Sequence, residues 1–417
     1  MTHKNWAGNY TYSTAKLHYP TSIEEIQDLV QSSTTIKVLG SRHSFNHISD
    51  SSDTLISLTK LPEFINIDPE NMTVTVSAGM NYGQVATYLQ KQGFALHNLA
   101  SLPHISIVGA CATGTHGSGV NNGNLATAVS GIEFISGTGL LISMSRDDGG
   151  IFKGLIVNLG AIGIITQITL DIVPTYEVRQ DVYLNLDLAQ LDTHFDDIMA
   201  SAYSVSLFTH YQNESINQVW LKSRVEDNPD FIAKDKFYGA ISADRNYHPI
   251  ADVSAENCTE QLGFSGAWHD RLPHFRMDFM PSKGDELQSE YFIPRKYAIE
   301  AIRCLYDIGD IIASKLLVGE IRCVASDNLW LSECYQEDSV AFHFTWEQDR
   351  DAVNDILIQM ETALVPFNPR PHWGKIFTMS AKDVQSHYEK LADFRMLIET
   401  LNPQGKFRNE FVNQYIF

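Results

Sequence analysis

The stretch Val38-Leu39-Gly40-Ser41-Arg42-His43-Ser44-Phe45-Asn46 is the feature from which the rest of the chain can be interpreted. It overlaps a mostly apolar run, residues 36–39, that is typical of a short buried strand. The strand pattern ends at Gly40, and the small polar residues after it predict a turn with outward-facing backbone N–H groups. Such a run of amides after a strand suits a pyrophosphate. His43 stands inside this turn, where a core histidine would be unusual.

A second glycine-rich stretch strengthens this interpretation: Ser106-Ile107-Val108-Gly109-Ala110-Cys111-Ala112-Thr113-Gly114-Thr115-His116-Gly117-Ser118-Gly119. Taken alone, the first stretch is a weak signal, because a strand followed by Gly and Ser is usually only a turn. Two such loops in one chain predict a long ligand with anionic or carbonyl-rich groups at its two ends.

Size and composition describe an ordinary globular protein. The chain has 417 residues, 44% of them hydrophobic, which is enough for two or three domains with a sizeable core. The formal net charge of -20 argues against nucleic acid and anionic membranes as partners. The first residues lack a secretory signal, and no apolar run reaches membrane-spanning length. The 5 cysteines are odd in number and lack C-x-x-C spacing, which favours reduced thiols in a cytoplasm; we expect no metal site.

The pattern of elements changes near residue 176. Before it, short strands and helices alternate with the glycine-rich loops. After it, longer alternating strands with aromatic residues are predicted at 204–211, 218–224, 287–293, 316–324 and 340–346. Helices are predicted at 296–306, 351–364 and 381–399. We therefore predict an α+β fold with a ligand-binding domain over 1–176, an antiparallel sheet domain with helices over 177–368, and a return segment over 369–417.

Two of the later strands carry the most informative side chains. A period of two places Glu320 and Arg322 on one face of the first, and His343 and Thr345 on one face of the second. The ordinary alternative is a solvated face on each strand. Compact hydrogen-bonding groups opposite bulky apolar residues favour a site instead. Gln288 follows the same pattern more weakly.

Two further residues are ambiguous by themselves. Lys375 follows Gly374 in an otherwise apolar setting, which by itself favours a surface lysine, and Ser101 by itself favours a turn. Together with the strand residues they offer donors, acceptors and one group that can take a proton near neutral pH. This set suits a neutral substrate with many hydroxyls, and no activated nucleophile for covalent hydrolysis is evident.

Several motifs also resemble a known family. They are residues 5–9 (NWAGN), 40–46 (GSRHSFN), 100–106 (ASLPHIS), 112–119 (ATGTHGSG), 320–322 (EIR), 343–346 (HFTW), 371–375 (PHWGK) and 401–407 (LNPQGKF). The chain resembles the vanillyl-alcohol-oxidase superfamily of flavoproteins almost end to end, and within it the bacterial enzymes that oxidise alditols. The resemblance implies a PCMH-type FAD-binding domain and a cap domain.

The resemblance also implies roles for individual residues. His43 matches the histidine bonded covalently to the 8α-carbon of the flavin. FAD contacts are implied for Gly40, Ser41, Arg42, Ser44, Phe45, Asn46, Ser101, Ser106, Gly109, Thr113, Gly114, Thr115, His116 and Ile165. Substrate contacts are implied for Ser101, Gln288, Glu320, Arg322, Thr345 and Lys375. The catalytic residues would be His343, Lys375, Arg322 and Glu320, with either His343 or Lys375 as the base. Arg42 departs from the family, which has a small residue at this place.

The implied reaction is oxidation of a terminal primary alcohol of an acyclic polyol, such as xylitol or sorbitol, to the aldose. Hydride would pass to flavin N5, and O2 would be reduced to hydrogen peroxide. The alternative within enzymes is an aldonolactone oxidase or dehydrogenase. An alternative from another class is a flavin-bearing or sugar-binding module without turnover. We expect a monomer whose partners are the polyol and O2. The physiological polyol and the cellular electron acceptor stay open.

Overall fold

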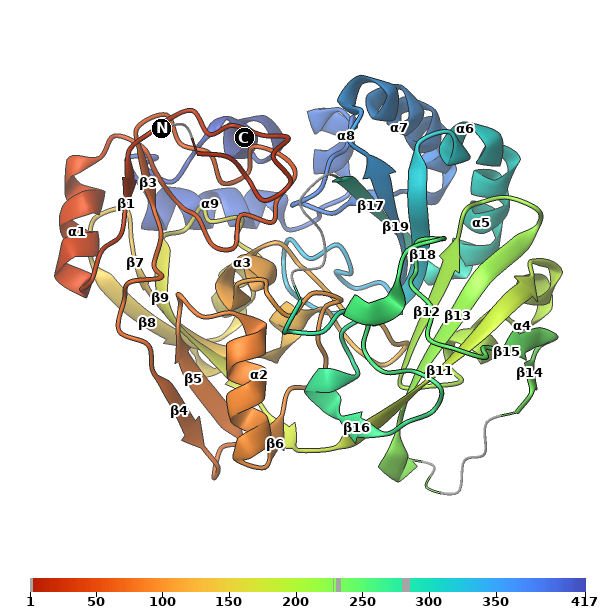
Figure 1. Ribbon diagram of the computed structural model, residues 1–417. Helices are drawn as coiled ribbons and strands as arrows, with labels where there is room; N and C mark the ends of the chain where they lie inside the picture. Colours follow the sequence, from red (N-terminus) through yellow and green to blue (C-terminus); the bar gives the residue numbers. More distant parts are fainter. Residues whose placement is uncertain (1–2, 228, 230–233, 280–285) are drawn as a thin grey trace.

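The computed structural model describes residues 3–227, 229, 234–279 and 286–417. Figure 1 shows two halves side by side, with both chain termini on the same half. The first half contains the N-terminal part of the chain and its last segment, and the second is built on one large sheet.

The first half holds three sheets with helices packed on them. Parallel strands form the order β1 (Leu17–His18), β3 (Thr54–Ile56), β2 (Ile36–Val38). Antiparallel strands form the order β4 (Ile65–Asp68), β5 (Thr73–Ser77), β9 (Ile164–Asp171), β7 (Val129–Ile135), β8 (Leu141–Ser145). A third pair is β10 (Val173–Pro174) with β6 (Phe94–Ala95). The helices are α1 (Ile23–Ser32), α2 (Tyr82–Lys91) and α3 (Ile107–Ala112).

Local sequence explains where these helices begin. The Ser22 hydroxyl accepts a hydrogen bond from the Glu25 N–H and caps α1, whose Ile26 and Val30 are buried. Asn81 and Gln84 form a reciprocal capping box at the start of α2. These caps pair backbone N–H groups that the first turn of each helix leaves without an intrahelical partner.

The second half is built on an antiparallel sheet, as predicted, and this sheet has 10 strands, more than the five named from the sequence. Its order is β14 (Lys236–Phe237), β15 (Ala240–Ser242), β11 (Glu177–Asp187), β13 (Ser215–Arg224), β12 (Ser204–Thr209), β18 (Leu316–Val324), β19 (Ser339–Glu347), β17 (Glu286–Pro294), β20 (Arg370–Pro371), with β16 (Gly266–Ala267) paired to β11. Helices α4 (Ala189–Met199), α5 (Ala298–Asp307), α6 (Gly309–Ala313) and α7 (Arg350–Leu364) cover its outer face.

The two faces of this sheet differ as the period of two predicts. Ile321, Cys323, Phe342, Phe344 and Trp346 belong to the same buried apolar cluster as the side chains of α4, α5 and α7. Because successive side chains of a strand point to opposite faces, the polar residues between them lie on the inner face, toward the first half. The α+β class with antiparallel sheets is confirmed.

The last segment returns to the first half. Trp373, Phe394, Ile398, Phe411 and Ile416 pack in the same apolar core as the N-terminal strands and helices. The predicted single helix over 381–399 is wrong: two helices, α8 (Ala381–Ser386) and α9 (Leu391–Leu401), are separated by a turn, and α10 (Glu410–Tyr415) follows. The turn places the buried Tyr388 ring 4.9 Å from the Trp373 ring, a packing contact that a continuous helical pattern does not reveal. The domain division at residues 176 and 368 stays a prediction.

Within the described residues, no helix combines the length and the apolar character needed to cross a lipid bilayer.

Candidate active site

A cavity of about 410 Å³ lies between the two halves. Its wall includes both glycine-rich loops on one side and the inner face of β17, β18 and β19 on the other. The structure therefore brings the two sequence features, the loops and the polar strand faces, into one site.

The two glycine-rich loops contact each other at the cavity wall. The Ser41 N–H donates to Ser106 Oγ at 3.4 Å, and the Ser106 N–H donates to Ser41 Oγ at 3.3 Å. A Cβ at Gly40 would lie 2.2 Å from Ser106 Oγ, and one at Gly109 would lie 2.6 Å from it. Glycine at position 40 therefore lets the two loops come this close, whereas Gly109 makes room for the Ser106 side chain within the second loop.

The first loop leaves several backbone donors unused. Among the described residues, the N–H groups of Arg42, His43 and Ser44 have no hydrogen-bond acceptor, whereas the flanking Phe45 N–H donates to the Gly374 carbonyl at 2.8 Å. Arg42 adopts a left-handed conformation with φ of 60°, which is uncommon for a residue with a side chain and explains why a small residue is suited to this place.

His43 lies on the cavity wall beside an aromatic ring. The centroids of its ring and the Trp6 ring are 4.4 Å apart, and Phe45 approaches it edge-on at 5.6 Å. Burial, together with the nearby positive charge of Lys375, lowers the pKa of His43 to about 3. The imidazole is therefore neutral at physiological pH, and its lone pair can act as a nucleophile.

Most residues with implied FAD contacts line the cavity. They are Gly40, Ser41, Arg42, His43, Ser44, Ser101, Ser106, Gly109, Thr113, Thr115, His116 and Ile165. Phe45, Asn46 and Gly114 lie behind the wall. The Asn46 amide donates to the carbonyls of Trp373 and Lys375 and ties the first loop to the last segment.

These observations fit a bound FAD. Free backbone donors on a glycine-rich turn suit an anionic pyrophosphate, and the loops are packed too tightly for a Cβ where they meet. A neutral histidine stands on the same wall. The residues that would hold FAD are those of the two loops, with Ile165 on β9.

The cap side of the cavity carries every residue predicted to contact substrate or to act in catalysis. Gln288, Glu320, Arg322, His343 and Thr345 project from the inner sheet face, and Ser101 and Lys375 join them from neighbouring segments. Lys375 is half-buried and lines the cavity, so it does not lie on the outer surface, as its sequence context by itself favoured.

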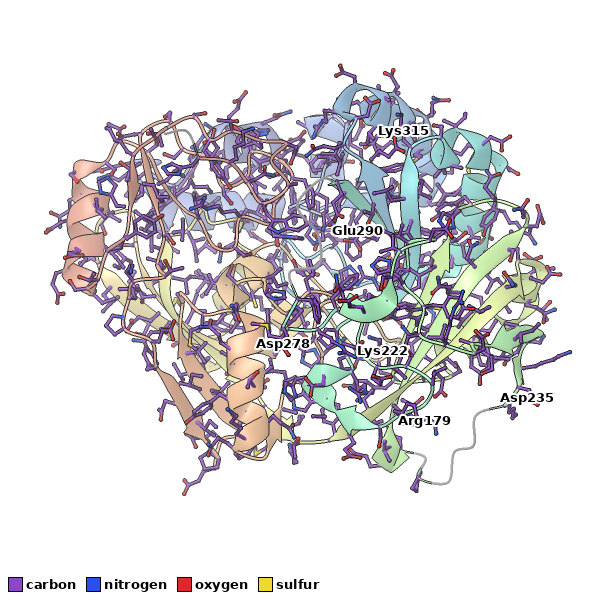
Figure 2. All side chains as sticks on the ribbon, in the orientation of Figure 1. Arg179, Lys222, Asp235, Asp278, Glu290 and Lys315 are labelled. Atoms are coloured by element: carbon purple, nitrogen blue, oxygen red, sulfur yellow. The ribbon has the colours of Figure 1, made fainter. Side chains whose placement is uncertain are left out.

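Glu290 on β17 stands at the centre of this polar set, between the two halves (Figure 2). Its Oε1 accepts from His116 Nε2 at 3.0 Å and from Arg322 Nη2 at 2.8 Å. Its Oε2 lies 3.3 Å from His343 Nδ1, close enough for electrostatic attraction although not aligned as a hydrogen bond. Burial would raise the pKa of Glu290, but the hydrogen bond from His116 and the positive charge of Arg322 outweigh this effect and hold the pKa well below its usual range.

His343 and Lys375 differ in charge at neutral pH. Burial lowers the pKa of His343 in spite of the opposing effect of Glu290, so its imidazole is neutral. Burial also lowers the pKa of Lys375, to about 8, which leaves the ammonium mostly protonated at pH 7. Lys375 Nζ donates to Gln288 Oε1 and lies 4.9 Å from the centre of the Phe45 ring.

Glu320 is held by two basic groups. His274 Nε2 lies 2.8 Å from its Oε1, and Arg322 Nε lies 3.5 Å from the same oxygen. Burial would raise the pKa of Glu320, but the charge of Arg322 and the hydrogen bond from His274 lower it strongly, so the group is a carboxylate. The Arg322 guanidinium also reaches Ser101 Oγ at 3.5 Å.

Sequence reasoning missed Glu290 and His274. Glu290 shares a face with Gln288 by the same period of two, and that signal could have identified it. His274 lies in an irregular segment before β17, where no periodic pattern exists.

The comparisons with known proteins agree with this geometry. A model described as an FAD binding domain matches residues 14–145, and one described as D-arabinono-1,4-lactone oxidase matches residues 277–415. The chain is 43% identical to the alditol oxidase of a Streptomyces species over 99% of this chain and 98% of the relative. It is 25% identical to bovine L-gulonolactone oxidase over 99% of this chain and 98% of that relative.

A solved structure shares the fold. Cholesterol oxidase from B. sterolicum superimposes with a TM-score of 0.79 over 100% of this chain and 96% of the other, at 14% identity. Identity at this level speaks for the fold alone, whereas the full-length match to the Streptomyces enzyme decides the family. The chain therefore belongs to the vanillyl-alcohol-oxidase superfamily of FAD-dependent oxidoreductases, in the family of the Streptomyces alditol oxidase.

Proposed function

We propose that this enzyme oxidises the terminal primary alcohol of an acyclic polyol to the aldose, with O2 as the electron acceptor. In the balanced reaction, the alcohol and O2 give the aldehyde and H2O2. The observation that carries the proposal is the placement of Ser101, Glu320, Arg322, Thr345 and Lys375 around one cavity that the FAD loops also line. When bound, FAD supplies the hydride acceptor and passes both electrons on to O2.

We further propose that His43 is bonded through its imidazole to the 8α-carbon of the flavin. A neutral ring on the cavity wall, inside the turn with free backbone donors, supports this assignment. The Trp6 ring, tilted against the imidazole with the ring centroids 4.4 Å apart, would restrict the rotation of His43.

The inner sheet face would hold the hydroxyls of the substrate. Glu320 accepts from one hydroxyl, and the Arg322 guanidinium donates to its neighbour. Thr345, Ser101 and Gln288 complete the pairing, because each buried hydroxyl needs both a donor and an acceptor. These contacts would orient the reacting carbon, which is a large part of the catalytic contribution of a rigid site.

His343 is the proposed base and Lys375 the proposed charge stabiliser. The Glu290 carboxylate beside His343 Nδ1 favours a proton on that nitrogen, which leaves Nε2 as the acceptor. Nε2 lies 3.3 Å from the Thr345 hydroxyl, at the cavity wall, where the alcohol proton would leave. The Lys375 ammonium would stabilise the negative charge that develops on the alcohol oxygen.

A substrate panel read by peroxide release tests this proposal. Purified enzyme is mixed with xylitol, sorbitol and L-gulonolactone, and the anaerobic bleaching of flavin absorbance is followed in parallel. We expect rapid bleaching and peroxide formation with the polyols. Turnover of gulonolactone alone would favour the lactone oxidase activities named for several relatives. Bleaching by a polyol without peroxide would indicate an acceptor other than O2.

A further inference from the structure

A buried lysine, a buried histidine and Glu320 form a continuous chain of side-chain contacts. Lys222 is on β13, His274 is in the segment before β17, and Glu320 is on β18. Lys222 Nζ lies 3.2 Å from His274 Nδ1, and His274 Nε2 lies 2.8 Å from Glu320 Oε1. All three side chains are buried; Figure 2 labels Lys222 on the cap side of the molecule.

Glu320 determines which nitrogen of His274 carries the proton. A carboxylate oxygen can only accept, so His274 Nε2, 2.8 Å from Glu320 Oε1, carries the proton of the neutral imidazole. Nδ1 then presents its lone pair toward Lys222 Nζ. Lys222 is held in place by its contacts with the carbonyls of Arg271 at 2.8 Å, Leu272 at 2.6 Å and Pro273 at 2.9 Å.

His274 is fixed from other directions as well. Its ring lies edge-on between Phe208 at 5.4 Å and Trp220 at 5.2 Å. Its backbone N–H donates to the Ser101 carbonyl at 3.1 Å. The same residue thus anchors the backbone of Ser101 and the side chain of Glu320, two of the proposed substrate contacts.

This arrangement leaves one oxygen of Glu320 for the substrate. His274 and Arg322 both approach Oε1, whereas Oε2 has no hydrogen-bond donor among the described residues. A carboxylate oxygen can only accept, so this position selects for a hydroxyl donor. A ligand without that hydroxyl would leave the buried oxygen unpaired, which is costly.

We propose that Lys222 and His274 are positioning residues that hold Glu320 as a hydroxyl acceptor and thereby set the requirement for a polyol. The inference rests on the proposed function for its consequence in catalysis. The Nε2–H tautomer of His274 does not depend on that function, so the positioning role and the proposed function can be tested separately.

The kinetic test compares two His274 variants. His274→Phe keeps a planar ring between Phe208 and Trp220 but loses both side-chain hydrogen bonds. We expect kcat/KM for xylitol to fall roughly 10- to 100-fold, the usual effect of losing a hydrogen bond to a charged group. His274→Gln, which can donate to Glu320 and accept from Lys222, should recover most of that loss.

A double-variant cycle separates positioning from general damage. If His274 acts through Glu320, adding His274→Phe to Glu320→Gln should cost about threefold or less, because the carboxylate that it orients is already gone. The inference would be overturned if the losses in kcat/KM of the two single variants multiplied in the double variant. It would also be overturned if His274→Gln were as impaired as His274→Phe. FAD content and melting temperature of each variant show whether the site is intact.

A second measurement needs no turnover. Nitrogen-15 NMR of histidine-labelled holoenzyme reports the tautomer of His274, with its signal assigned from the His274→Gln variant. We expect a neutral ring with its proton on Nε2, and in Lys222→Met the same tautomer with a shifted Nδ1 signal, because that nitrogen loses its hydrogen-bond donor. An Nδ1–H tautomer or a doubly protonated ring near pH 7 would refute the inference, even if the wild type oxidises polyols. Absence of polyol oxidation, with the tautomer as expected, would refute only the proposed function.

Discussion

Glu290 Oε1 lies 3.0 Å from His116 Nε2, and this buried pair joins the cap sheet to the second glycine-rich loop. The same carboxylate contacts Arg322 and approaches His343. One side chain therefore connects the loop that would hold FAD to the residues that would hold and deprotonate the substrate.

Replacing Glu290 should damage both stability and catalysis. Glu290→Gln leaves the buried Arg322 guanidinium without its Glu290 countercharge, and breaking such a pair costs roughly 3–5 kcal/mol. We expect a clearly lower melting temperature and a fall in kcat/KM for polyols of about 100-fold or more. Glu337→Gln is the matched control, because Glu337 pairs with Lys296 in an exposed ion pair, and such pairs contribute little to stability. Similar small effects in both variants would contradict the role given to Glu290.

The covalent bond to His43 predicts a simple result. Wild-type protein precipitated with acid should give a yellow pellet, because the flavin cannot leave. His43→Ala should give a colourless pellet and a yellow supernatant. His104→Ala, which changes another histidine of the cavity wall, should keep the colour in the pellet. A colourless wild-type pellet would exclude the bond.

The rate of polyol oxidation should depend on pH with two limbs. The proposed base, His343, must be neutral, and burial lowers its pKa below the ordinary 6.5, so activity should fall only on the acid side of that value. The Lys375 ammonium is lost as pH rises through its pKa of about 8, so activity should also fall above that pH. Peroxide release measured from about pH 5 to about pH 10 gives kcat/KM. Lys375→Met should lower the rate strongly and remove the alkaline limb; an unchanged alkaline limb in this variant would assign it to another group.

Arg42 offers a test of the first loop. Its φ of 60° is accessible to glycine but strongly unfavourable for a β-branched residue. Arg42→Gly should therefore retain covalent flavin, whereas Arg42→Val should reduce the fraction of protein that carries it. The ratio of absorbance near 450 nm to that at 280 nm after acid precipitation measures this fraction. Equal flavin content in both variants would mean that the backbone conformation does not limit attachment.

Local pattern alone was enough to predict a substantial part of this molecule. Alternation in β18 and β19 placed Glu320, Arg322, His343 and Thr345 on one face, because side-chain direction in a strand depends only on position along it. The two glycine-rich loops were likewise predictable, because the end of a strand and the conformational freedom of glycine depend on only a few neighbouring residues. The α+β class followed from the same short-range signals.

What the tertiary structure decided is which of these groups are buried and which are paired. The segment around Lys375 by itself favoured a surface residue, and only the packing of the return segment against the cap sheet places this lysine, half-buried, on the cavity wall. His274 sits in an irregular stretch, yet Glu320, far from it in the chain, determines its proton position. Burial, ion pairing and tautomeric state depend on contacts between distant residues, and no periodicity in the chain encodes them.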